Sequence, residues 1–499
     1  MKYRPMMRCA TLLLLAVSGC GGDVKTYRAN APVSSAPAKN AAPDPHAWRN
    51  ERPKPGTPGT VRFPAPEFVK LPSGLALAMV PTSAEVVTLR FVVRHGASSV
   101  PEGKSGLAAL TARMMTEGTR KRSSLELAEQ AEALGSSLES DAGRDESTIG
   151  LSALASDVDR ALELLAEVVT QPAFDAKEFE RVRAEWLDGL VAERQSPDRL
   201  ASLAGLRLLN GAVHGAPVSG GVSDVKRLTT KDLAEFHARR WQPEASALVL
   251  VGKVDTAGVR ASVDKHFKAF KARAGAANKP PSLPAAPERL RVVLVDRPGA
   301  VQSAVFGAQR FPARAEPGFE ARELLGEIVG GLFTSRINQN LREKHAYTYG
   351  ARGRPVATRH WGAFVVSTSV RTDVTAPAVE QILVELKKAR DPSLGAPIEP
   401  AELDRGRADL LHSLGARLEH TSRIADAVIG QFVADLGQDY YARYPATLAA
   451  IVPGEVSENA KLLAPERMVF VIAGDTSRFA SELAKLGAVV ENANEGLTD

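Results

Sequence analysis

The feature that most constrains this 499-residue sequence is an internal repeat. Residues 243–252 run from Pro-Glu into an apolar stretch that ends in glycine, and residues 465–474 repeat the arrangement with the same spacing. Short apolar runs bounded by turn residues are typical of buried strands. Near the start of each half, residues 75–93 and 290–307 each predict two strands joined by a short turn and followed by a helix. The chain is therefore predicted to contain two copies of one strand-and-helix unit.

The order of these elements predicts the fold class. Long helical patterns lie between the strands of each half, at residues 125–134, 155–170, 176–194 and 402–436, and amphipathic helices follow the closing strands at 257–270 and 478–486. This arrangement is typical of an α+β protein in which an antiparallel-rich sheet is covered on one face by helices, here twice. The predicted segments are an N-terminal domain (61–273), a proline-rich linker (274–289), a C-terminal domain (290–490) and a tail (491–499).

The first residues have the pattern of a secretion signal. A basic start precedes an apolar run at residues 10–17, which is shorter than the roughly 20 residues needed to span a bilayer. The run ends in Val-Ser-Gly before Cys20, which resembles a lipobox, in which the thiol receives a diacylglyceryl group. A plain signal peptide with an incidental cysteine is the alternative. The residue after the cysteine is Gly21 rather than an acid, which resembles the sorting signal of outer-membrane lipoproteins. We expect residues 1–19 to be removed and residues 20–60 to form a flexible tether. The mature protein is then expected to be held by its lipid in the outer membrane of the cell envelope and to face the periplasm.

Charge, cysteine content and missing motifs argue against nucleic-acid binding, covalent catalysis and nucleotide binding. Cleavage after residue 19 would lower the formal net charge of +5 by three, so the composition gives no support to nucleic-acid binding. Cys9 and Cys20 are the two cysteines, so processing would leave no thiol for covalent catalysis. The sequence contains no G-x-S-x-G elbow, and Gly96 lies too far from Gly103-Lys104-Ser105 to form a phosphate loop.

Several motifs together resemble the insulinase/pitrilysin (inverzincin) family of zinc metallopeptidases. They are residues 106–119, which begin Gly-Leu-Ala and end Gly-Thr, and the stretches 214–217 and 236–243. The resemblance implies two similar α+β domains and a first helix that carries H-x-x-E-H in catalytic members, where two histidines bind zinc and the glutamate is the general base.

In this chain the zinc motif is degenerate. Ala109, Ala112 and Arg113 occupy the positions of the first histidine, the glutamate and the second histidine. A guanidinium beside a divalent cation is repelled by about 4 kcal/mol per pair of unit charges at about 4 Å and an effective dielectric of 20. We therefore expect no metal and no catalytic residue in this chain.

The third ligand of the family, a glutamate, comes from a later helix. Glu185 lies near that place and Glu180 lies one turn earlier, but without histidines both are expected to be ordinary surface acids. None of the nine histidines begins H-x-x-E-H or H-E-x-x-H, so the motif has not moved elsewhere.

The second half retains what the first lacks. Residues 330–350 resemble the family's C-terminal signature, in which an arginine and a tyrosine seven positions later hold the carbonyls of the substrate backbone, and Arg342 and Tyr349 match that pair. Both side chains can donate hydrogen bonds to a peptide carbonyl. The alternatives are a surface arginine paired with a neighbouring acid and a half-buried strand tyrosine. Tyr347 is expected to pack in the core, and the adjacent Gly330 and Gly331 to form a tight turn.

The resemblance implies a division of labour between two chains. Many bacterial members are pairs of related subunits, one with H-x-x-E-H and one with the arginine and tyrosine, and this sequence resembles the second kind. It is then expected to position peptide or unfolded polypeptide substrates for a related catalytic subunit that holds the zinc. A non-enzymatic scaffold or peptide-binding lipoprotein of the same fold is the alternative, and an independent peptidase with an unrecognised site is a third possibility.

Overall fold

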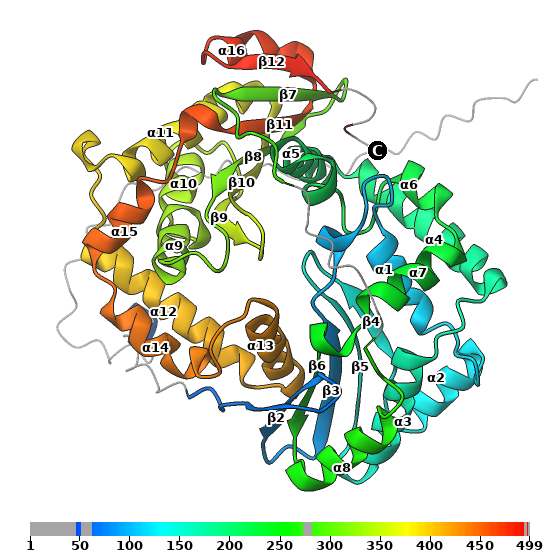
Figure 1. The fold of residues 1–499 in the computed structure, drawn as a ribbon. Coiled ribbons are helices and arrows are strands. Elements are labelled where there is room, and N and C mark those ends of the chain that lie inside the picture. Colours follow the sequence, from blue (N-terminus) through cyan, green and yellow to red (C-terminus); the bar gives the residue numbers. More distant parts are fainter. Residues whose placement is uncertain (1–45, 51–61, 273–281, 494–496, 498–499) are drawn as a thin grey trace, which may run out of the picture. The chain divides into compact units, whose positions relative to one another are not determined.

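The computed structural model describes residues 46–50, 62–272, 282–493 and 497 (Figure 1). The chain divides into two compact units, residues 1–58 and 59–499, and in the first of them the structure describes the short 3-10 helix η1 (Ala47–Asn50). The predicted signal peptide, Cys20, most of the tether and part of the linker lie outside the described residues. Within the described ranges, no helix combines the length and apolar composition needed to cross a bilayer.

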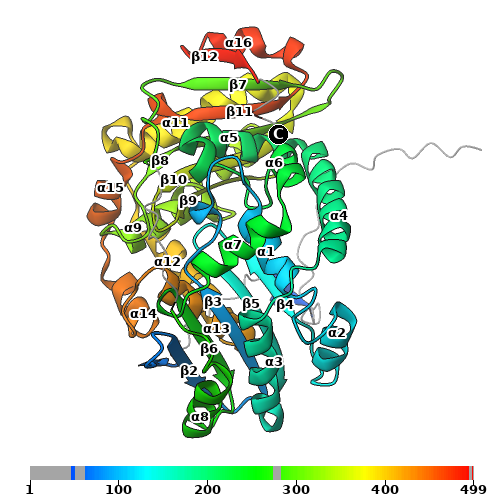
Figure 2. The ribbon, with the colours of Figure 1, turned by 45° about the vertical axis from the view of Figure 1, so that its right-hand side comes forward.

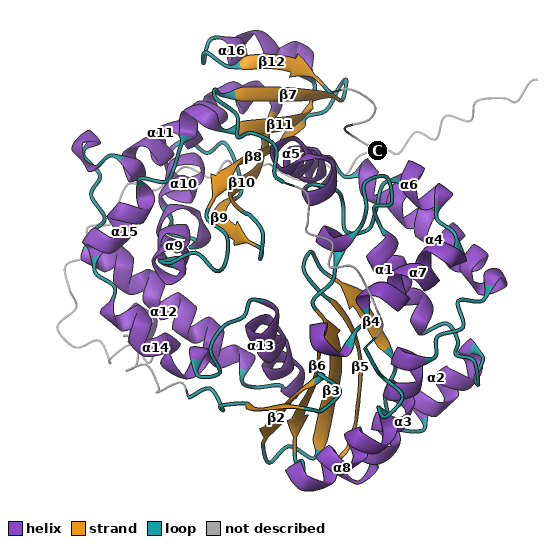
Figure 3. Ribbon diagram, in the orientation of Figure 1, coloured by secondary structure: helices purple, strands orange, loops and turns teal. Residues whose placement is uncertain are grey.

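The first half of the second unit is built on a mixed six-stranded sheet (Figure 3). Its order is β1-β2-β6-β3-β5-β4, and only the β2–β6 pair is parallel. The strands are β1 (Glu67–Lys70), β2 (Ala76–Pro81), β3 (Val86–Val93), β4 (Glu139–Ala142), β5 (Ser147–Leu154) and β6 (Ser246–Gly252). The helices are α1 (Leu107–Met115), α2 (Ser124–Glu132), α3 (Val158–Thr170), α4 (Ala176–Gln195), α5 (Pro197–His214), α6 (Val222–Arg227), α7 (Thr230–Arg240) and α8 (Thr256–His266).

The second half repeats most of this plan in the order β12-β7-β11-β8-β10-β9, but here β7 is parallel to both β11 and the edge strand β12. Its strands are β7 (Arg291–Asp296), β8 (Gln302–Phe311), β9 (Ala351–Ala357), β10 (Gly362–Arg371), β11 (Val469–Gly474) and β12 (Val489–Asn492). Its helices are α9 (Phe319–Gly326), α10 (Arg336–Asn338), α11 (Thr375–Arg390), α12 (Pro400–Arg417), α13 (Thr421–Val433), α14 (Tyr440–Ala450), α15 (Pro453–Ala460) and α16 (Ala480–Ala484), with two π-helices, η5 (Glu327–Gly331) and η6 (Gln339–Lys344). The repeat predicted at residues 243–252 and 465–474 is thus confirmed, because β6 and β11 are equivalent and fully buried strands.

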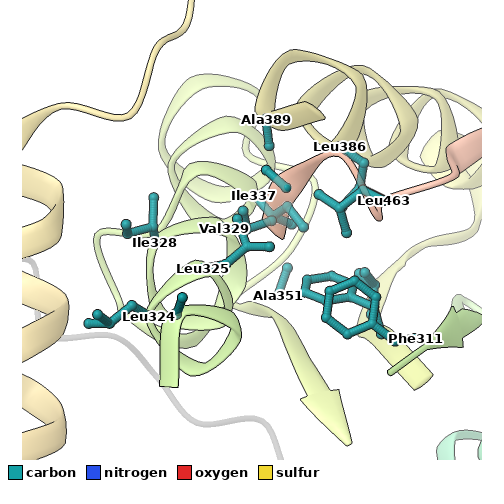
Figure 4. Packing of buried hydrophobic residues seen from close by; sticks show 14 of the residues in the cluster. Phe311, Leu324, Leu325, Ile328, Val329, Ile337, Ala351, Leu386, Ala389 and Leu463 are labelled. Atoms are coloured by element: carbon teal, nitrogen blue, oxygen red, sulfur yellow. The ribbon is translucent and has the colours of Figure 1, made fainter. Parts of the chain in front are cut away.

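Strand periodicity divides each sheet between two cores. In β2, Leu77 and Met79 belong to the cluster beneath the helices of the first half, whereas Ala78 and Val80 face the opposite cluster. That opposite cluster continues into the second half, where Figure 4 shows Leu324, Val329 and their neighbours packed together. The two halves therefore share buried apolar surface.

Each half contributes one helix to the sheet of the other half. Helix α5 packs on β8 and β11 of the second sheet, and α13 packs on β3 and β6 of the first (Figure 1, Figure 2). The hydroxyl of Thr421 at the start of α13 lies 2.8 Å from that of Thr88 on β3. The predicted fold class is confirmed, but the prediction that helices cover only one face of each sheet is wrong, because these exchanged helices cover part of the other face.

The helical pattern predicted at residues 402–436 is divided between two helices. Helix α12 ends at Arg417 and α13 begins at Thr421, with His420 in an extended conformation between them (φ −127°, ψ 136°). The break lets α13 turn onto the first sheet and bury Ile424 and Val428. The equivalent break between α4 and α5 lies at Ser196, which caps α5 before a proline, a common helix-starting pattern.

Candidate functional site

The three positions that the sequence predicts to correspond to the zinc motif lie on α1, whose residues four apart share a face. Ala112 is fully buried and Ala109 is 8% exposed, so two of the three positions present only methyl groups inside the first core. Arg113 is partly exposed and directs its guanidinium to Glu117, 2.5 Å away. Two methyl groups and a cation provide no donor atoms for zinc, so the residues at these positions do not fit the metal.

Arg113 has a structural partner at this place. The Glu117 carboxylate is 4% exposed, and it accepts hydrogen bonds from Arg181 of α4 and, at 3.1 Å, from the hydroxyl of Ser124. Hydrogen bonds from Arg181 to Glu178 and Glu185 raise the pKa of the Arg181 guanidinium. The helix face that would carry the histidines is therefore part of an ion-pair network with a buried acid at its centre.

The structure separates the two candidate glutamates on α4. Glu185 lines a cavity of 460 Å³ together with Arg113 and Trp186, and its carboxylate accepts a hydrogen bond from Arg181 at 3.0 Å. Glu180 instead pairs with Arg183. Across the described ranges, no group of three or more His, Cys, Asp or Glu side chains is arranged to hold a metal ion.

Arg342 lies on the π-helix η6 of the second half. Its side chain is 33% exposed, its Nε lies 3.7 Å from the carboxylate of Glu343, and its guanidinium stacks 4.3 Å from the ring centroid of Phe333. An ion pair of this length between partly exposed groups is weak, whereas stacking on an aromatic ring holds the guanidinium in one orientation. The predicted alternative of a neighbouring acid is present, but it leaves the donors of Arg342 available.

Tyr349 lies two residues before the start of the edge strand β9, and its side chain is 92% exposed. The backbone beside it is fixed, because the Thr348 hydroxyl lies 2.8 Å from the carbonyl of Ser369 and the amide of Ala351 donates to Asn338 at 3.0 Å. The alternative of a half-buried strand tyrosine is therefore wrong. A phenol that is exposed on a rigid backbone segment is available to a ligand.

The residues around this pair differ from their predicted roles in one respect. Tyr347 packs against the core and stacks on His345, as predicted. Gly330 and Gly331 do not form a tight turn but lie in η5, where a Cβ on Gly330 would meet the backbone nitrogen of Gly353 at 2.2 Å. The glycine at 330 is thus required by close contact between η5 and β9.

Tyr349 opens onto a cavity of 830 Å³ between the start of α5 and the exposed face of the second sheet. Phe333, the residue that stacks on Arg342, lines the same cavity and is 63% exposed. The wall on the α5 side includes Asp198, which accepts a hydrogen bond from Ser369 at 2.7 Å. The predicted arginine and tyrosine are therefore connected to one cavity, Tyr349 directly and Arg342 through Phe333, whereas Arg113 lines a different one.

Sequence reasoning missed two arginines in this cavity. Arg352 and Arg354 line its wall from β9 and are exposed. Their alternation in a strand that follows Tyr349 was the available signal, since residues two apart share a face of a sheet. Without knowledge that α5 stops short of β9, nothing in the sequence showed that this face was open.

The comparisons with known proteins agree with this architecture. Residues 77–203 match the family model for insulinase (peptidase family M16), and residues 227–410 match the model for the peptidase M16 inactive domain. A crystal structure of a peptidase M16 inactive domain from Pseudomonas fluorescens has the same fold, with a TM-score of 0.75, 23% sequence identity, and coverage of 82% of this chain and 97% of that chain.

Sequence relatives include proteins with different descriptions. An uncharacterized zinc protease of Mycobacterium tuberculosis is 28% identical over 296 residues, which cover 57% of this chain and 66% of that protein. Subunit 1 of the mitochondrial cytochrome b-c1 complex of Bos taurus is 24% identical over 209 residues, which cover 41% of this chain and 43% of the subunit. In both alignments the chain spans less than two thirds of the relative.

The two family models match consecutive parts of the chain. Residues 77–203 begin in β2 of the first half, and residues 227–410 begin at the end of α6 and extend through much of the second half into α12. The chain therefore belongs to the insulinase (M16) peptidase family, as a homologue of its zinc proteases that contains both the N-terminal domain and the inactive C-terminal domain.

Proposed function

We propose that this protein is the non-catalytic, substrate-positioning subunit of a heteromeric zinc metallopeptidase that processes peptides in the cell envelope. The observation that carries the proposal is the contrast between two sites in one chain. The zinc-motif positions hold Ala109, Ala112 and Arg113, whereas Arg342 and the 92% exposed Tyr349 are both present.

The role of this chain's residues follows from their donors. Arg342 and Tyr349 donate hydrogen bonds to carbonyl oxygens of an extended peptide and so hold its backbone in one position. Zinc and the general base are supplied by a related partner subunit that carries H-x-x-E-H. Lipid modification of Cys20 anchors the complex to a membrane, facing the periplasm, and nucleic acid is no partner of this subunit.

The first experiment identifies the partner. The protein is purified gently from native membranes, and stoichiometric co-eluting chains are identified by mass spectrometry. A related chain with H-x-x-E-H supports the proposal. A lone chain, a self-dimer or an unrelated partner contradicts it.

The second experiment tests the two site residues in the isolated complex. Because removal of a donor to a developing oxyanion costs about 10²-fold to 10³-fold in rate, we expect Arg342→Ala and Tyr349→Phe to lower kcat/KM for peptide cleavage by at least about tenfold each. Tyr347→Phe is the matched control for the phenol, since its ring packs against the core. Arg443→Ala, at a surface ion pair on α14, is the control for the guanidinium. Unchanged cleavage by both site variants would contradict the assignment.

The second candidate function is a non-enzymatic scaffold of the same fold. It is favoured by the similarity to a subunit of the cytochrome b-c1 complex. The same purification separates the two functions, since a scaffold co-purifies with a complex that lacks an H-x-x-E-H chain.

A further inference from the structure

The cavity beside Tyr349 has a charged wall that the pair of backbone-binding residues does not explain. Three arginines line it, namely Arg199, Arg352 and Arg354, against the single acid Asp198. Arg199 is engaged by Glu193, and Asp198 is engaged by Ser369. The unbalanced charge therefore lies on β9.

Arg352 and Arg354 have no ion pair, hydrogen bond or aromatic partner within the part of the chain that the structure describes. This distinguishes them from most arginines of the protein, which pair with an acid or a carbonyl, as Arg336 does with Glu402 at 2.6 Å. Two neighbouring guanidinium groups without a counter-charge repel each other, and an anionic ligand would relieve that repulsion.

The sheet register places both arginines on the cavity side. Arg352 lies opposite Ser367 and Arg354 lies opposite Val365 in the β9–β10 pairing, and both partners also line the cavity. On the other face of β9, Gly353 lies against η5. The two guanidinium groups are thus presented side by side, two residues apart, toward the space into which Tyr349 projects.

We infer that this cavity selects acidic peptides, with Arg352 and Arg354 binding carboxylate side chains at alternate positions of an extended segment. An extended chain presents every second side chain on the same side, which matches the spacing of the two arginines. The exposed aromatic rings of Phe333 and Tyr349 supply apolar contact in the same cavity. The inference rests on the proposed function, since it names the substrate class of the same site.

A peptide fits these observations better than a nucleic acid. The formal net charge of the whole chain is only +5, and this cavity presents just two arginines that have no partner among the described residues. A nucleic-acid surface instead presents many cationic groups along a face or groove.

The test measures peptide binding to the full single chain and needs no cleavage. The probe is a fluorescein-labelled peptide of about twelve residues with glutamate at alternate positions, compared by fluorescence anisotropy with the same peptide carrying glutamine. At low salt we expect the glutamate peptide to bind about tenfold more tightly, and we expect Arg352→Gln/Arg354→Gln to abolish the difference. The double variant Arg423→Gln/Arg443→Gln removes the same amount of charge from surface ion pairs, and it should preserve the difference in affinity between the two peptides.

Three outcomes overturn the inference. The first is equal binding of the two peptides. The second is a preference for the glutamate peptide that survives Arg352→Gln/Arg354→Gln. The third is that the chain binds a single-stranded oligonucleotide through these arginines and does not bind the peptides. Failure here is distinguishable from failure of the proposed function. If Arg342→Ala abolishes cleavage but the chain shows no preference for acidic peptides, the proposed positioning role stands and the inference fails. If the chain prefers acidic peptides but has no H-x-x-E-H partner, the inference about the cavity stands and the proposed function fails.

Discussion

At the scale of single residues, a buried carboxyl group links the stability of the second half to pH. Glu323 on α9 accepts a hydrogen bond from the hydroxyl of Tyr444 at 3.0 Å. Burial raises the pKa of Glu323 to about 7. Because the folded state then holds the proton more tightly than the unfolded state, this group stabilises the fold at low pH, and that contribution is lost as the pH rises through about 7.

We therefore expect Glu323→Gln to raise the free energy of unfolding at pH 8 by about 1–3 kcal/mol more than it does at pH 5. The amide oxygen can still accept from Tyr444, so the variant removes only the charge. Urea denaturation at the two pH values measures the difference. Glu458→Gln, at an exposed ion pair with Lys461, is the control. An equal effect of Glu323→Gln at both pH values would show that the carboxyl is not protonated in the folded state.

At the scale of elements, the site depends on close contact between a π-helix and a strand. In η5, a Cβ on Gly330 would meet the nitrogen and the Cα of Gly353 on β9 at 2.2 and 2.4 Å. Backbone atoms on both sides cannot move away as the end of a side chain can. Since β9 follows Tyr349 and carries Arg352 and Arg354, this contact also determines where the candidate site lies.

We expect Gly330→Ala to destabilise the protein by about 2–4 kcal/mol through this overlap. Gly189→Ala is the matched control, because Gly189 is inside α4 and a Cβ there meets no atom within 4 Å. That control should stabilise by about 0.5–1 kcal/mol, since alanine favours a helix interior over glycine. Thermal unfolding of both variants measures the contrast, and equal changes would contradict the observed packing.

At the scale of the whole second unit, an ion-pair cluster joins the two halves. Asp435, which follows α13 with a left-handed backbone (φ 53°), lies 2.6 Å from Arg94 of the first half and 2.9 Å from Arg359 of the second. The backbone amide of Arg359 also donates to Asp145 at 2.7 Å. These contacts supplement the exchanged helices in holding the halves together.

We expect Asp435→Asn to lower the free energy of unfolding by about 1 kcal/mol, because two arginines are left facing each other. Asparagine tolerates the left-handed conformation as well as aspartate does, so the substitution isolates the charge. The loss should shrink in about 1 M NaCl. Asp439→Asn, which breaks the ion pair between the residue before α14 and Arg443 of that helix, should cost less at low salt. A loss that is independent of salt would mean that the cluster does not act through charge.

Much of this architecture could be predicted from local sequence. The apolar strands at residues 243–252 and 465–474 were recognisable because a buried strand needs a continuous apolar run between turn residues. Arg342 and Tyr349 were recognisable because their spacing resembles a known signature. The break between α12 and α13 was not, because Leu418, Glu419 and His420 carry no glycine or proline signal and the helix ends there for the sake of tertiary packing.

The sequence by itself determined the repeated strand-and-helix plan, the residues at the predicted zinc-motif positions and the presence of the arginine and tyrosine, since each depends on residue type and spacing along the chain. Tertiary structure alone decided that α5 packs on the second sheet and α13 on the first, that the buried Glu117 also pairs with Arg181 of α4, and that Arg352 and Arg354 face an open cavity without ion-pair partners among the described residues. These features depend on which distant segments meet, and contact between segments far apart in sequence is fixed by the packing of the whole unit rather than by local pattern.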